Sequence, residues 1–178
     1  ADEEADIMIG TQMIVKGHDF PNVTLVGVLA ADMSLYSDDY RSGERTFQLL
    51  TQAAGRAGRG RRPGEVVIQT YSPEHYSIQM AARQDYEGFY EKEMNYRDLM
   101  GYPPASQLMA VLMTGADEVR LATAAEYLKK YAVRVNTGEE IQVIGPASPS
   151  VGKVNDVYRK VLYLKSREYK ELVWIKNH

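Results

Sequence analysis

The sequence predicts an α/β fold in two parts, a mainly parallel sheet within residues 1–70 and a small α+β domain over residues 71–178. For the first part, residues 23–30 are almost continuously apolar and β-branched, which is typical of a strand covered on both faces. A helix expected at 44–54 separates this strand from another at 65–70. Strand, crossover helix and strand in succession favour parallel pairing.

The second part is predicted from a change of pattern at the proline-bearing turn near residue 71. Its expected elements are helices at 75–83 and 85–100, a strand at 108–114, a helix at 117–133, strands at 141–145 and 158–165, and a helix at 168–175. Asp117 is expected to cap the helix that follows it. From the strand at 108–114 onward, the β-α-β-β-α order indicates an antiparallel sheet of the split β-α-β kind.

The composition is ordinary for a globular chain, with 44% hydrophobic and 25% charged residues. No apolar run approaches the ~20 residues of a membrane span, and the N-terminal residues do not have the pattern of a secretory signal. We therefore expect no membrane association and a cytoplasmic location. The absence of cysteine excludes disulfides and thiolate metal sites, and the three histidines lack ligand spacing, so no metal site is expected.

Positive charge is concentrated in one region although the net charge of the chain is −3. Residues 41–62 contain six arginines and one acid, Glu44, which gives a local charge of +5. Segregation of this kind can steer an anionic ligand to one face of a protein. A solvated arginine-rich loop is the alternative interpretation.

The stretch around which the chain is organised reads Gln-Ala-Ala-Gly-Arg-Ala-Gly-Arg over residues 52–59. Guanidinium groups stay charged and bind phosphate oxygens through two parallel hydrogen bonds. Glycines allow phosphates to approach the backbone closely. Arg56 and Arg59, three residues apart, lie near each other if the segment is helical, and can converge on a nucleotide phosphate. A glycine-rich surface turn without a ligand is the alternative.

A second informative stretch reads Ile-Met-Ile-Gly-Thr-Gln-Met-Ile-Val-Lys-Gly-His-Asp-Phe-Pro-Asn-Val over residues 7–23. It is interpreted as a short strand at 7–9 followed by a polar turn. Thr11 comes directly after this strand, where a hydroxyl and backbone N–H groups can hold a phosphate. A threonine at a strand end with an Asp closing a turn is the structural alternative.

Together, these two stretches resemble motifs V and VI of superfamily 2 helicases, and most closely those of the PriA family of replication-restart helicases. A weaker likeness continues through Gly-Tyr-Pro-Pro at 101–104 and Gly-Pro-Ala at 145–147. The resemblance implies that residues 1–70 end a RecA-like second helicase lobe and that residues 71–178 form the C-terminal domain. The chain would then be a C-terminal fragment of a larger protein.

The resemblance also implies roles for individual residues. Arg56 and Arg59 would stabilise charge on the transferred phosphoryl group, with Gln52 helping to position them. Gly17 and Asp19 would lie near the nucleotide. Contacts to the nucleic-acid backbone are expected at four positions, three from motif V and one from the arginine-rich region: Thr11, Gln12, Lys16 and Arg41.

For the whole protein, the resemblance implies an ATP-dependent 3′ to 5′ DNA helicase that acts at stalled or repaired forks in replication restart and primosome assembly. ATP and Mg²⁺ would be held mostly by a lobe outside this chain, because the sequence has neither a phosphate loop nor an Asp-Glu-x-His motif. The chain alone is therefore not expected to hydrolyse ATP. The family also implies zinc, but cysteine ligands are absent here.

The partners implied are forked or single-stranded DNA, single-stranded DNA-binding protein and other primosome proteins. Two further interpretations stay open. The chain could act as a non-catalytic module that docks DNA or protein, or it could belong to another superfamily 2 repair translocase.

Overall fold

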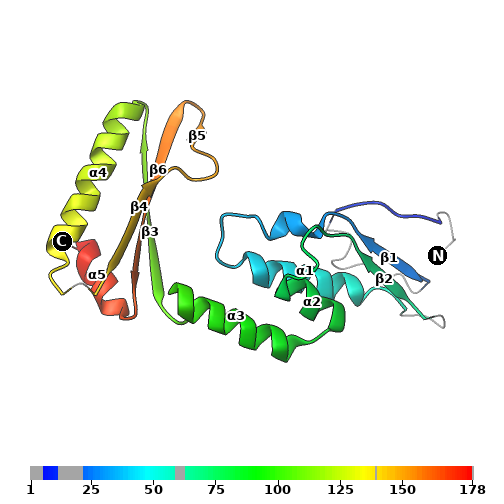
Figure 1. Cartoon of the computed structure of the whole chain (residues 1–178). Helices are drawn as coiled ribbons and strands as arrows, with labels where there is room; N and C mark the ends of the chain where they lie inside the picture. The colour runs from blue at the N-terminus through cyan, green and yellow to red at the C-terminus, as the bar shows by residue number, and fades with distance from the viewer. Residues whose placement is uncertain (1–5, 12–21, 59–62, 139, 178) are drawn as a thin grey trace. The chain divides into compact units, whose positions relative to one another are not determined.

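The computed structural model describes residues 6–11, 22–58, 63–138 and 140–177 (Figure 1). The chain divides into two compact units, unit 1 (Ala1–Glu93) and unit 2 (Met94–His178). The division falls inside one helix, α3, which is drawn as a single continuous ribbon. Each unit is a mixed α/β structure built around a small sheet.

Unit 1 contains a two-stranded parallel sheet and the helices that pack against one side of it. Strand β1 (Leu25–Val28) pairs with β2 (Glu65–Ile68) in the register Leu25↔Glu65 to Val28↔Ile68. Between the strands lie a short 3₁₀ helix, η1 (Ala31–Ser34), and α1 (Ser42–Ala54). Helix α2 (Tyr76–Arg83) and α3 (Tyr86–Met100) follow. The parallel pairing and the helix between the strands confirm the order predicted from the sequence.

Phenylalanine rings from α1 and α3 form the centre of the unit 1 core. The Phe47 and Phe89 rings stack with centroids 4.1 Å apart, and both side chains are buried. Leu50 from α1 and Ile78 from α2 complete this core, while Val28 and other strand residues pack on it from the sheet. Apolar positions at the helical spacing predicted for residues 44–54 therefore do face the interior.

Two expectations for this part of the chain need correction. Leu25 in β1 is 59% exposed and Val67 in β2 is 51% exposed, so the strand pair is covered on one face only. Residues 7–9, expected as a strand, are not paired within the described part of the chain, and Ile9 is 91% exposed. An isolated three-residue segment forms no ladder without a neighbouring strand.

The first compact unit also extends beyond the boundary expected after residue 70. Helix α2 packs on α1, and Phe89 of α3 stacks on Phe47 of α1. The compact unit therefore continues to Glu93. The division of the sequence at residues 70 and 71 itself stays a prediction.

Unit 2 is built on an antiparallel sheet with the strand order β3-β6-β4. Its elements are β3 (Gln107–Gly115), α4 (Glu118–Val135), β4 (Gln142–Ala147), β5 (Lys153–Val154), β6 (Val157–Ser166) and α5 (Tyr169–Asn177). Strand β6 lies between β3 and β4 and runs antiparallel to both. This arrangement confirms the split β-α-β pattern predicted from the sequence.

Helices α4 and α5 bury one face of this sheet. The core contains Leu162 and Leu164 from β6, Ala132 from α4, and Leu172 and Ile175 from α5. The Asp117 carboxylate accepts a hydrogen bond from the backbone N–H of Arg120 at 2.9 Å, which confirms the predicted cap of α4. The short strand β5 lies between the strands predicted at 141–145 and 158–165, where no element was predicted. It pairs with β6 through a turn in which Asn155 and Asp156 both have positive φ.

Candidate functional site

The arginine segment, residues 55–58 with the described arginine Arg56, leaves the C-terminal end of α1. The backbone of Gly55 stays in the right-handed helical region, with φ −67°, and its N–H donates to the Thr51 carbonyl oxygen. Arg56 and Ala57 continue with N–H bonds to the Ala53 and Ala54 carbonyl oxygens at 3.0 and 3.3 Å. Gly58, with φ +72°, ends this turn. The helix therefore sets the position of Arg56.

The segment is attached to the sheet directly after this turn. The backbone N–H of Gly58 donates to the Val23 carbonyl oxygen at 3.0 Å, two residues before β1 begins. The buried face of α1, with Phe47, Leu50 and Ala53, holds the helix against the core of unit 1. Helix packing and this backbone hydrogen bond together fix both ends of the described segment.

Of the residues predicted for catalysis, the structure describes two. Gln52 is exposed in the last turn of α1, and Arg56 is half-buried in the turn that follows. The structure thus places them in adjoining turns at the same end of one helix. Arg59 lies outside the described residues.

Of the five residues predicted from the upstream stretch, the structure describes one. Thr11 is described and exposed. The remaining four lie outside the described residues: Gln12, Lys16, Gly17 and Asp19. Their roles stay predictions.

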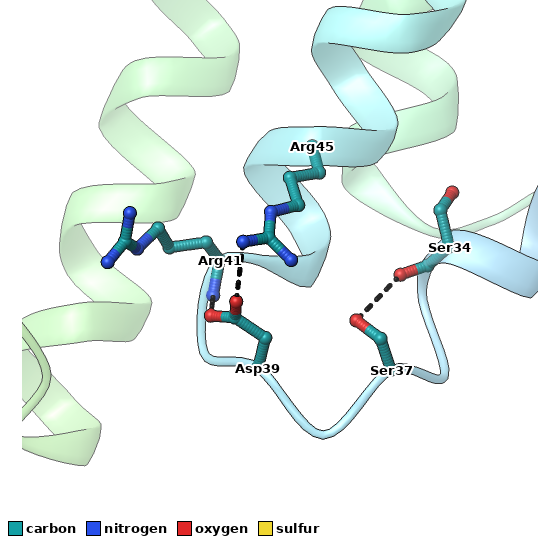
Figure 2. A network of polar contacts seen from close by, with 5 residues as sticks. All are labelled: Ser34, Ser37, Asp39, Arg41 and Arg45. Carbon is teal, nitrogen blue, oxygen red and sulfur yellow. Dashed lines mark hydrogen bonds and ion pairs between the residues drawn. The ribbon is translucent and has the colours of Figure 1, made fainter. Parts of the chain in front are cut away.

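Arg41 lies at the other end of α1, in a loop organised by Asp39 (Figure 2). One carboxylate oxygen of Asp39 accepts the backbone N–H of Arg41 at 3.0 Å, and the other pairs with the Arg45 guanidinium at 2.8 Å. Ser37 closes the start of the loop by donating its hydroxyl to the Ser34 carbonyl oxygen at 3.3 Å. The loop is therefore held by its own side chains before any ligand binds.

The Arg41 guanidinium points away from Asp39 in Figure 2. Its central carbon lies 5.1 Å from the centroid of the Tyr40 ring, which is within the range of a cation–π contact. The side chain is exposed, and among the residues that the structure describes no carboxylate forms an ion pair with it, whereas the charge of Arg45 is neutralised by Asp39. Of these two arginines, Arg41 is thus the one whose guanidinium is available to bind a phosphate.

Sequence reasoning did not identify two acids that shape this region. Asp39 positions Arg41 and Arg45. The sequence feature that could have identified this role is its position two residues before Arg41, which is the spacing of an Asx turn. Asp32 is buried, and its carboxylate accepts the Thr70 hydroxyl and the N–H groups of Tyr71 and Ser72. These hydrogen bonds, that from Thr70 foremost, lower the pKa of Asp32 and tie η1 to the end of β2.

A smaller group of basic residues lies on the β5–β6 hairpin in unit 2. Lys153 pairs with Asp156 at 2.8 Å, a hydrogen bond that raises the pKa of this lysine, and its ammonium group lies 4.8 Å from the Tyr158 ring centroid. Lys160 donates to the Ser148 hydroxyl at 3.0 Å. These contacts already engage the ammonium groups of the two lysines, so the hairpin is a weaker candidate for phosphate binding than Arg41.

Within the described residues, no group of three or more metal-ligating side chains comes together. No helix in the same part of the chain has the length and apolar character that crossing a membrane requires.

Comparison with known proteins identifies relatives of both units. Residues 98–175 match the family described as the primosomal protein N C-terminal domain. The chain is 46% identical over 169 residues, 95% of its length, to the replication restart protein PriA of Bacillus subtilis. It is 41% identical over 162 residues (91%) to PriA of a Synechocystis species, and 38% identical over 167 residues (93%) to PriA of Rickettsia felis.

The aligned regions make up 21%, 19% and 25% of these three relatives, so the chain spans about a fifth to a quarter of their length. The likeness covers the arginine segment as well as the C-terminal domain, because it extends over more than nine-tenths of the chain. The resemblance inferred from the sequence motifs is thereby confirmed. The chain belongs to the PriA family of replication restart proteins.

Proposed function

We propose that the protein containing this chain is an ATP-dependent DNA helicase of replication restart, and that unit 1 supplies the arginine half of its ATPase site. The observation that carries the proposal is the described arginine segment, which leaves α1 with Gln52 and Arg56 in adjoining turns in a chain of PriA-family sequence. Arginines held in this way stabilise charge on a transferred phosphoryl group. ATP and Mg²⁺ are the cofactors, bound mostly by residues outside this chain.

The exposed face of β1 and β2 supports the placement of unit 1 at the end of a RecA-like lobe. Parallel sheets are covered on both faces in α/β proteins, and a two-stranded sheet is marginal by itself. Leu25 and Val67 project from the uncovered face, where apolar side chains are exposed. Further strands and helices of a larger lobe would bury them.

The remaining roles follow from family membership. Motif V residues Thr11, Gln12 and Lys16 would grip the DNA backbone, with Gly17 and Asp19 near the nucleotide. The DNA is forked or single-stranded, and translocation is 3′ to 5′. Protein partners are single-stranded DNA-binding protein and other primosome proteins, and the location is cytoplasmic.

The test is DNA-stimulated ATP hydrolysis by the full-length protein carrying Arg56→Ala or Arg59→Ala. An arginine acting on the transferred phosphoryl group contributes about 10³–10⁵-fold to turnover, so kcat is expected to fall by at least about 10³-fold. Arg83→Ala is the matched control, because Arg83 is an exposed arginine on a different helix, at the end of α2. Near-normal turnover in both segment variants would refute the proposal.

A second candidate function, a DNA-docking surface in unit 1, is favoured by Arg41. Its guanidinium is exposed and rests on the Tyr40 ring, while Asp39 holds the loop. Binding to forked DNA measured against salt should show log affinity falling by about 0.7–0.9 per phosphate contact per log unit of salt. Arg41→Ala should lower this slope by about one contact and Arg83→Ala should not. An unchanged slope in Arg41→Ala would exclude the contact.

A further inference from the structure

Gly58, at the end of the arginine segment, and Gly64, directly before β2, lie against each other in the structure. The Gly58 N–H donates to the Val23 carbonyl oxygen at 3.0 Å. Glu65, next to Gly64, donates its N–H to the Thr24 carbonyl oxygen at 2.8 Å. The end of the arginine segment and the start of β2 therefore attach to adjacent residues just before β1.

At this point the two backbones approach so closely that no side chain fits. A Cβ on Gly64 would lie 2.2 Å from the Gly58 nitrogen and 2.4 Å from the Ala57 carbonyl carbon. A Cβ on Gly58 would lie 2.7 Å from the Gly64 nitrogen, and the φ of +72° at Gly58 adds strain for any other residue. The obstructing atoms belong to the backbone, so a change of rotamer cannot relieve the overlap.

Other glycines nearby do not have this constraint. A Cβ on Gly55, in the same segment, would lie 3.5 Å from its nearest neighbour, the Thr51 carbonyl oxygen, which is an ordinary contact. A Cβ on Gly27 in β1 would meet nothing within 4 Å. The close approach at Gly58 and Gly64 is therefore a local feature of the arginine segment.

We propose that Gly64 is a positioning residue for Arg56. Because glycine has no side chain, the two backbones can approach closely, and this approach determines where the Arg56 guanidinium lies relative to the phosphoryl group. The inference rests on the proposed function of the arginine segment. Ala57 links Arg56 to Gly58, and a methyl group on Gly64 would displace the Ala57–Gly58 peptide. A shift of about 1 Å in a group that acts on the reacting atoms can cost about 10²-fold in rate.

The experiment compares Gly64→Ala with Gly115→Ala in the full-length protein, because a Cβ on Gly115, at the end of β3, would lie 3.6 Å from its nearest neighbour, the Leu121 Cβ, which is an ordinary contact. Gly64→Ala is expected to lower the kcat of DNA-stimulated ATP hydrolysis by about 10²-fold, with affinities for ATP and forked DNA within about twofold of wild type. The control variant should keep kcat within about twofold. Adding Gly58→Ala to Gly64→Ala should cost less than the sum of the two single effects, because both disturb the same contact.

Hydrogen exchange gives a readout that does not depend on turnover. The Gly58 amide should exchange faster in Gly64→Ala than in Gly115→Ala, because displacement weakens its hydrogen bond to the Val23 carbonyl oxygen. Pro63→Gly is a milder second variant that adds backbone freedom beside Gly64 without adding an atom, and it should lower kcat in the same direction.

Three results would overturn the inference: wild-type kcat in Gly64→Ala, unchanged exchange at Gly58, or a fall in ATP affinity matching the fall in kcat. If the Gly64→Ala protein does not fold, a wild-type kcat in Pro63→Gly would decide against the inference. These outcomes differ from failure of the proposed function. In that case Arg56→Ala itself keeps normal turnover.

Discussion

A single buried acid, Asp32, ties together the two stretches of chain that follow β1 and β2. Its carboxylate receives three hydrogen bonds from the chain that leaves β2. A carboxylate that accepts several hydrogen bonds is stabilised in its charged form, which is why the pKa of Asp32 is lowered. Removing the charge leaves the N–H groups of Tyr71 and Ser72 with a poorer acceptor.

We therefore expect Asp32→Asn to lower the stability of unit 1 at neutral pH. The lowered pKa means that the folded state favours the ionised form, so the stabilisation is present above the ordinary pKa of 3.8 and is lost as the pH falls through the folded value. Urea unfolding followed by tyrosine near-ultraviolet circular dichroism should show the variant and wild type converging below about pH 4. Asp38→Asn, at an exposed neighbouring acid, is the control and should behave as wild type at every pH. A gap that persists unchanged at low pH would contradict this role for the charge.

At the scale of the elements, the end of α3 is held by a lysine from the sheet of unit 2. The Lys165 ammonium group donates to the Met100 carbonyl oxygen at 2.9 Å and lies 3.7 Å from the Tyr102 ring centroid. Arg97 on the same helix donates to the Pro103 carbonyl oxygen at 3.0 Å. A cation at a helix C-terminus satisfies carbonyl groups that have no partner within the helix. Burial lowers the pKa of Lys165.

Lys165→Met should keep the aliphatic packing and remove both polar contacts. We expect unit 2 to lose about 1.5–3 kcal/mol of unfolding free energy, the usual net contribution of a hydrogen bond that involves a charged group. The single tryptophan, Trp174 in α5, reports urea unfolding of this unit by fluorescence. Lys130→Met, at an exposed position on α4, provides the comparison. Equal unfolding midpoints for the two variants would show that the Lys165 contacts do not stabilise the unit.

The sequence predicted most elements because their signals are local. Apolar spacing located α1, and Asp117 marked the start of α4, where its carboxylate indeed caps the helix. The two-residue strand β5 was missed because it depends on pairing with β6 through a tight turn. The candidate site was predicted in the same way, because Gln52 and Arg56 belong to a local sequence motif. The close approach of Gly58 and Gly64 could not be predicted, because it is a contact between two backbone segments that no sequence motif marks.

At the scale of the whole molecule, the sequence could not show which surfaces stay uncovered. The apolar run at 23–30 predicted a strand covered on both faces, but Leu25 and Val67 are exposed in unit 1. The pattern of apolar residues indicates how apolar a strand is, but it does not show which part of the protein packs on that strand. An uncovered apolar sheet face next to the arginine segment is consistent with the proposal that unit 1 is one part of a larger helicase lobe.

The most direct test of the proposed arginine role is the affinity of the full-length protein for ADP with aluminium fluoride, an analogue of the phosphoryl-transfer transition state. An arginine that acts in the transition state stabilises this complex and not the ADP ground state. We predict that Arg56→Ala and Arg59→Ala weaken binding of the analogue by at least about 10²-fold and leave ADP affinity unchanged, with Arg83→Ala as wild type. Unchanged analogue affinity in both variants would contradict the assignment of this segment to the ATPase site.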